Sequence, residues 1–169
     1  MTERPQVSVR WARTADIREI RGLVKPLAER RVLLNKEAVA YYEAVPEFRV
    51  AEVDGRVVGC GALHVMWEDL GEIRTLAVAQ DALGLGVGSA ILRTLVDDAR
   101  EIGLQRLFCL TFETEFFGRH GFEAIAGQAV EPEVYVELLR SYDEGVAEFL
   151  DLERVKPNTL GNTRMLLQL

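Results

Sequence analysis

The sequence contains only two cysteines, Cys60 and Cys109, and both lie inside apolar runs that read as strands. This placement favours buried free thiols over a disulfide bond. The fold must then be stabilised by its core. With 169 residues the chain is long enough to bury such a core as one domain over residues 1–169.

Basic residues are too few to outnumber the acidic ones. The chain has 20 Lys and Arg against 27 Asp and Glu, which gives a net charge of −7. A protein that binds nucleic acids generally would need a basic surface, so we expect no nucleic-acid partner. Any phosphate group must be held locally, by backbone amides rather than by the overall charge.

Long hydrophobic segments are missing as well. No apolar run is long enough to cross a membrane, and the N-terminus lacks the hydrophobic region of a secretory leader. We therefore expect no membrane partner and a cytoplasmic location.

The hydrophobic patterns that are present predict a mixed α/β domain. Its front half is expected to be antiparallel, because Asp54-Gly55 between two β-rich runs is a strong hairpin signal. Pro26 is expected to kink or break the first helix, and residues 146–155 are ambiguous. The predicted strands cover residues 7–11, 48–53, 56–66, 73–79, 105–111 and 163–169, and another starts at 121. The predicted helices cover residues 14–31, 36–45, 87–101, 113–120 and 132–142.

Residues 72–89 are the most informative segment. The strand at 73–79 leads into a loop with glycines at 84, 86 and 88, and a helix starts at the end of that loop. A glycine-rich turn that opens a helix leaves backbone N–H groups free for an anion such as a phosphate. Two common nucleotide motifs fail at Ser89, where a P-loop requires lysine and a dinucleotide fingerprint requires glycine.

This loop resembles instead the acetyl-CoA site of the Gcn5-related N-acetyltransferase (GNAT) superfamily, whose pattern is Gln/Arg-x-x-Gly-x-Gly/Ala. Residues 83–88 (LGLGVG) match it, with Leu83 departing at the first position. Residues 73–78 (IRTLAV) resemble the fourth strand of the superfamily, and residues 116–122 (FFGRHGF) resemble its short helix ending in Gly-Phe. The resemblance implies a mixed, mostly antiparallel twisted sheet flanked by helices.

Three runs resemble more narrowly the acetyltransferase domain of the N-acetylglutamate synthases, the first enzymes of arginine biosynthesis. They are GEIRTLAV at 71–78, LFCLT at 107–111 and FFGRHGF at 116–122. The chain would be a short form without the amino-acid-kinase domain that often precedes this one. Residues 127–160 are longer than the matching stretch in the synthases, and we expect them to cap the substrate site or to form a contact.

The resemblance also implies roles for particular residues. Glu72 would be the base that takes a proton from the amine, directly or through a water molecule. Thr111 would supply an acidic or orienting hydroxyl, since Phe117 stands where many relatives have tyrosine. No metal is required. The residues expected to bind acetyl-CoA through their backbone are Thr75, Leu76 and Val78 for the pantetheine arm and Leu83, Gly84, Leu85, Gly86, Val87, Gly88 and Ser89 for the pyrophosphate.

The resemblance also points to two regions that would bind the acceptor amino acid. In the synthases, an arginine near the first inter-helix loop and another before the last strand hold the carboxylates of the amino acid. The matching regions here supply Leu33, Asn35 and Lys36, and then Thr163 and Arg164, with Gly161 favoured at the second arginine position. The loss of one of these cations would weaken the binding of a dianionic substrate. Glutamine or another amino acid with a neutral side chain therefore stands beside glutamate.

The expected function is N-acetylation of the α-amine of glutamate or a close analogue, with acetyl-CoA as donor. Two alternatives stay open at this point. One is an acetyltransferase for another small amine or a peptide N-terminus, and the other is a non-catalytic acyl-CoA-binding sensor. Relatives often dimerise, so a homodimer is possible.

Overall fold

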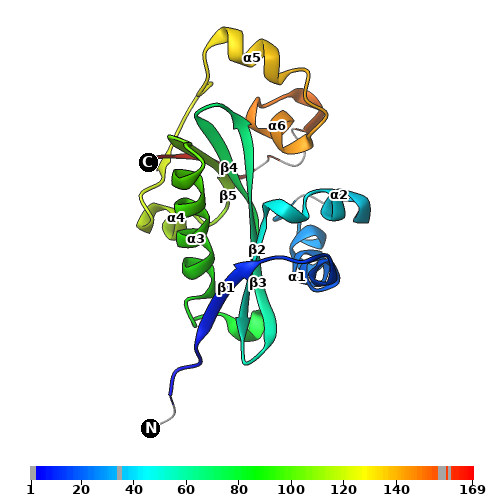
Figure 1. Cartoon of the computed structure of the whole chain (residues 1–169). Coiled ribbons are helices and arrows are strands. Elements are labelled where there is room, and N and C mark those ends of the chain that lie inside the picture. Colours follow the sequence, from blue (N-terminus) through cyan, green and yellow to red (C-terminus); the bar gives the residue numbers. More distant parts are fainter. Residues whose placement is uncertain (1–2, 34–35, 156–158, 160) are drawn as a thin grey trace.

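A computed structural model describes residues 3–33, 36–155, 159 and 161–169 of the chain. Its strands form one seven-stranded sheet in the order β1-β2-β3-β4-β5-β7-β6. Helices lie against both faces, with α1 and α2 on one side and α3 and α4 on the other (Figure 1). The strands are β1 (Val7–Trp11), β2 (Phe48–Val53), β3 (Arg56–Trp67), β4 (Leu70–Val78), β5 (Arg106–Thr111), β6 (Glu123–Ala124) and β7 (Thr163–Gln168).

The first four strands pair antiparallel in sequence order, as the hairpin signal predicts. Asp54 and Gly55 turn β2 into β3 with φ angles of 50° and 76°, which is the positive-φ geometry that favours such a pair. The last strand of the chain, β7, lies between β5 and β6 and is antiparallel to both.

Most predicted helices form, with shifted ends. Helix α3 has the predicted bounds, whereas α1 is not broken at Pro26 and continues to Glu29. The predicted helix at 132–142 ends at Leu138, and the ambiguous stretch 146–155 contains most of α6 followed by a 3-10 turn (Glu153–Val155). The helices are α1 (Ile17–Glu29), α2 (Ala38–Glu43), α3 (Val87–Glu101), α4 (Thr114–Arg119), α5 (Pro132–Leu138) and α6 (Glu144–Phe149). Short 3-10 turns cover Thr14–Asp16, Val45–Glu47 and Gln80–Ala82.

Three apolar clusters hold these elements together. Ile91, Leu92 and Leu95 of α3 are fully buried on one face of the sheet, and Ile17 and Ile20 of α1 on the other. The third cluster joins α6 to β5, where the rings of Phe108 and Phe149 meet edge to face at 4.9 Å. Both cysteines are buried free thiols, as predicted. Among the described residues, no helix combines the length and apolar character needed to cross a membrane.

The sheet opens between its two central strands. Strand β4 pairs with β5, in parallel, only at Leu70, Gly71 and Glu72. Just beyond, the register against β3 shifts opposite Thr75, whose φ of 57° marks a bulge. A bulge bends its strand and increases its twist, so β4 turns away from β5 after Glu72. This fork positions the site.

Candidate active site

A cavity of about 430 Å³ lies in the fork. The diverging halves of β4 and β5 form two of its walls, and the segment after α1, helix α4 and helix α6 form the others. The predicted residues Leu33, Lys36, Glu72, Thr75, Leu76 and Thr111 all line it. The fold therefore brings together residues from three separate segments of the sequence.

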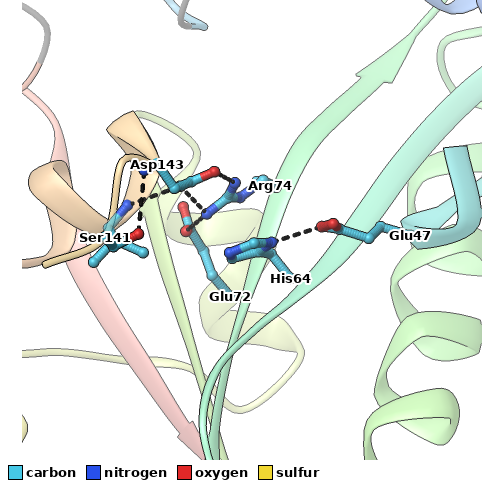
Figure 2. A network of polar contacts seen from close by, with 7 residues as sticks. Glu47, His64, Glu72, Arg74, Ser141 and Asp143 are labelled. Carbon is cyan, nitrogen blue, oxygen red and sulfur yellow. Dashed lines mark hydrogen bonds and ion pairs between the residues drawn. The ribbon is translucent and has the colours of Figure 1, made fainter. Parts of the chain in front are cut away.

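Glu72 lies at the point where β4 leaves β5, and only 6% of it is exposed. Its Oε2 accepts a 2.6 Å hydrogen bond from Nη2 of Arg74, as Figure 2 shows. The same guanidinium donates to both carboxylate oxygens of Asp143, each at 3.0 Å. A buried carboxylate is thus held in place by a buried arginine.

Asp143 ties this pair to α6. Its Oδ1 accepts a hydrogen bond from the N–H of Val146 and so caps the helix. Burial alone would raise the pKa of Asp143, but the hydrogen bonds and the charge of Arg74 outweigh burial and lower this pKa to about 2. The Arg74–Asp143 pair therefore stays charged at all ordinary pH values and fixes α6 against β4.

Among the other ionisable groups that line the cavity, Glu148 and Lys36 have shifted pKa values. Burial, followed by the charge of Glu72, raises the pKa of Glu148 on α6 to about 7. Burial and the nearby charge of Arg74 lower the pKa of Lys36. Sequence reasoning missed Arg74, Asp143 and Glu148 as site residues. The sequence could have indicated Arg74, because residues two apart on a strand share a face and Arg74 follows Glu72 by two positions.

Thr111 ends β5 at the cavity wall and is 8% exposed. Its Oγ1 accepts a 2.8 Å hydrogen bond from the N–H of Glu113, which leaves the hydroxyl proton to point elsewhere. Phe117 lines the same wall, at the position of the missing tyrosine. The cavity therefore has one hydroxyl and an apolar ring on this side.

The glycine loop lies beyond the cavity, at the end of β4. Gly84 and Gly86 have φ angles of 82° and 80°, and Gly86 begins α3 as its N-cap. Within the described part of the chain, the N–H groups of Val87, Gly88 and Ser89 meet no acceptor, as expected for a first helical turn. Two of the predicted amides are already engaged, because Leu83 and Leu85 direct their N–H groups to Gln80 and Ala82 at 3.5 and 3.4 Å.

The fork leads from the cavity to this loop along β4. Val78 lies outside the cavity lining, and a Cβ at Gly88 would be 3.7 Å from its side chain. Ser89 Oγ lies 3.1 Å from Nε2 of His120, at the end of α4. Along the chain, the buried Glu72 is therefore followed by the part of β4 that is not paired with β5, and then by the free amides at the start of α3.

Of the predicted acceptor residues, Thr163 and Arg164 are not part of the cavity wall. Arg164 points away and donates hydrogen bonds to the carbonyls of Gly127 and Phe149, so that it fastens residues 127–150 to β7. Thr163 pairs with Thr111 in the sheet and does not line the cavity. Asn35 falls outside the described residues. Asn162, one residue before Thr163, does line the cavity.

This fold and site define a class of acyl-transferring enzyme. The chain belongs to the Acetyltransferase (GNAT) family, whose model matches residues 14–122. The resemblance predicted from the sequence, the fold class and acetyl-CoA as donor are confirmed.

Particular relatives narrow the class. The chain is 58% identical to the amino-acid acetyltransferase of Mycobacterium tuberculosis, over 100% of both chains. It is 40% identical to an amino-acid acetyltransferase of Neisseria meningitidis, over 69% of this chain but 27% of that one.

Two solved structures agree with this. The structure of Rv2747 from Mycobacterium tuberculosis in complex with CoA and NLQ superposes with a TM-score of 0.93 and 59% identity, over 96% of this chain and 99% of that one. N-acetylglutamate synthase from Neisseria gonorrhoeae, complexed with coenzyme A and N-acetyl-glutamate, gives a TM-score of 0.76 and 30% identity, over 97% of this chain and 35% of that one. The chain thus covers 99% of the Mycobacterium tuberculosis protein and 35% of the Neisseria gonorrhoeae synthase.

Proposed function

We propose that this protein transfers the acetyl group of acetyl-CoA to the α-amino group of glutamate or a close analogue such as glutamine. One observation carries the proposal. The cavity at the β4–β5 fork holds the buried carboxylate of Glu72, which is paired with Arg74, together with Lys36 and the open edge of β4. An amino acid carries an ammonium group and a carboxylate. Its binding site therefore needs a carboxylate to face the ammonium and cations to face the carboxylate.

The residues present fit the acetyl donor. Acetyl-CoA supplies an acetyl group activated as a thioester. The free N–H groups of Val87, Gly88 and Ser89, at the positive end of the α3 dipole, suit its pyrophosphate. Beyond Glu72, the backbone of Thr75, Leu76 and Val78 is not paired with β5, and we expect it to bond the pantetheine amides as an added strand would. The carbonyl of Thr75 already accepts a hydrogen bond from Sγ of Cys60.

Residues of the protein would carry out proton transfer, orientation of the reacting groups and exclusion of water. Glu72 accepts a proton from the nitrogen that becomes acetylated, because that nitrogen must lose protons before it can become an amide. Thr111 orients the reacting groups with its hydroxyl. The rings of Phe116 and Phe117 in the wall limit the access of water.

The charges around the cavity favour an acceptor with a neutral side chain. The charged residues that line the cavity balance, with three cations (Arg31, Lys36 and Arg74) and three carboxylates (Glu72, Glu113 and Glu148), and Arg74 is already paired with Glu72 and Asp143. Arg164, predicted as a second clamp, is engaged elsewhere. A single carboxylate is therefore easier to accommodate than two, which supports glutamine over glutamate within this proposal.

Steady-state release of CoA tests the proposed function. Purified protein with acetyl-CoA is assayed against glutamine, glutamate, aspartate, a simple alkyl amine and a short peptide. We expect the highest kcat/KM for glutamine or glutamate. Turnover of the peptide or alkyl amine alone would support the broader acetyltransferase alternative, and CoA binding without any turnover would support the sensor.

Replacing Lys36 with methionine should raise KM for the amino acid about tenfold and leave kcat nearly unchanged. Hydrogen bonds to charged groups contribute about 1.5–3 kcal/mol, and Met keeps most of the side-chain volume. The matched control is Lys25→Met, on the exposed side of α1. An unchanged KM in the Lys36 variant would exclude this residue from acceptor binding.

Three further expectations belong to the same proposal, and the name of one relative, N-acetylglutamate synthase, supports the first of them. They are a role in the first step of arginine biosynthesis, a cytoplasmic location and assembly as a homodimer.

A further inference from the structure

Helix α6 contributes a second carboxylate to the acceptor cavity. Gly145, in its first turn, lies against Arg74 so closely that a Cβ there would overlap Nη2 of the guanidinium. Glu148 follows three residues later and therefore lies on the same side of the helix. Both residues line the cavity in which Glu72 lies.

The two cavity glutamates differ in their partners. Glu72 is paired with Arg74 at 2.6 Å. The carboxylate of Glu148 has no ion pair and no hydrogen bond to any residue that the structure describes. Glu148 itself is half-buried. A partly desolvated carboxylate without a partner is less stable than a paired one, and a cationic group that arrives with the substrate supplies the missing partner.

The reaction provides such a group and requires more than one proton acceptor. Acetyl transfer forms a C–N bond, breaks the C–S bond and converts an ammonium into an amide, so the nitrogen loses two protons. One proton ends on the sulfur of CoA and the other goes to solvent. The first must leave before attack, because an ammonium has no free electron pair.

We propose that Glu148 takes the first proton, from the α-ammonium of the acceptor, and that Glu72 takes the second as the amide forms. This division rests on the proposed function. Glu72, fixed by Arg74, stays in one position, whereas Glu148 has no ion pair or hydrogen bond with the described residues to lose when it is protonated.

The surroundings of Glu148 suit this role. Burial, then the charges of Glu72 and Glu144, raise its pKa, while Arg74 and Lys36 act in the opposite direction, and the result is about 7. A carboxylate with a pKa near the working pH is a far better acceptor for an ammonium proton than an ordinary glutamate.

The test is a pH profile of kcat/KM for the wild type and for Glu148→Gln, with glutamine as acceptor. The wild type should show an inflection near pH 7. In the variant we expect at least a tenfold lower value at pH 7, no such inflection, and recovery at high pH where the amine is already deprotonated. The dissociation constant for CoA should not change. Glu148→Asp should restore part of the rate, and Glu153→Gln, exposed in the same segment, should behave as the wild type.

Thermal unfolding separates loss of function from loss of fold. The pKa of Glu148 is raised by folding from 4.5 to about 7. The folded protein therefore binds a proton that the unfolded chain has already released, and stability falls as pH rises through this window. Glu148→Gln removes that penalty, so its Tm at pH 8 should exceed that of the wild type by a few degrees.

The outcomes are distinct. Wild-type kcat/KM at pH 7 in Glu148→Gln, with the inflection retained, overturns the role of Glu148 and leaves the proposed function standing. A wild-type protein that acetylates no amino acid overturns the proposed function, and this role with it.

Discussion

Replacing Glu72 with glutamine should lower kcat by about 10²–10⁴-fold, the usual contribution of a general base, and leave the affinity for acetyl-CoA unchanged. Glutamine has nearly the same shape, and its carbonyl oxygen can still accept the hydrogen bond from Arg74. What it loses is the capacity to accept a proton. CoA release measures kcat, and calorimetric titration with CoA measures affinity.

The control for this variant is Glu68→Gln, in the exposed turn between β3 and β4. It removes the same charge a few residues away and should leave both constants unchanged. A kcat for Glu72→Gln within about threefold of the wild type would show that Glu72 is not the base, since general bases contribute far more than this.

Replacing Gly86 with valine should weaken the binding of acetyl-CoA at least tenfold. Gly86 has a φ of 80° at the start of α3. A β-branched residue in this conformation is strained by about 1–3 kcal/mol, and relief of that strain moves the free N–H groups of Val87 and Gly88. The added side chain also obstructs the approach of a diphosphate to the backbone.

The hairpin glycine offers a matched control. Gly55 has a φ of 76°, and, like Gly86, it has open space around its Cβ position. Gly55→Val should lower Tm about as much as Gly86→Val and should not change the affinity for CoA. Equal affinities in the two variants, measured by titration, would show that the glycine loop does not hold the donor.

Local pattern was enough to predict most of the fold. Helix α3 has the predicted bounds because its apolar spacing, the glycines before it and Gly103 after it all agree. The hairpin at Asp54-Gly55 is equally local. The helix break predicted at Pro26 does not occur, which shows the limit of such local rules. Helix α1 is held by Ile17, Ile20 and Val24, which precede Pro26 and are all buried.

The chemistry of the cavity depends on contacts that no local pattern reveals. The hydrogen bonds between Arg74 and Asp143 join residues 69 positions apart. The fork itself arises from pairing that stops after Glu72 and from a bulge at Thr75. Arg164 is a candidate clamp by sequence alone, and only its bonds to Gly127 and Phe149 show that it holds the chain together instead.

Residues 127–160 were expected to cap the substrate site or to form a contact. Helix α6, within this segment, supplies part of the cavity wall through Gly145 and Glu148. It is fixed there by Asp143, which caps the helix and is paired with Arg74. The segment therefore helps to shape the cavity in which the acceptor is proposed to bind.

The most direct measurement is the fate of a labelled acetyl group. The protein is incubated with isotope-labelled acetyl-CoA and glutamine or glutamate, and the products are identified by NMR and mass spectrometry. We expect label in an amide on the α-nitrogen of the amino acid, formed by the wild type and far more slowly by Glu72→Gln. Label found only in free acetate or unreacted acetyl-CoA would contradict the proposed acetyl transfer.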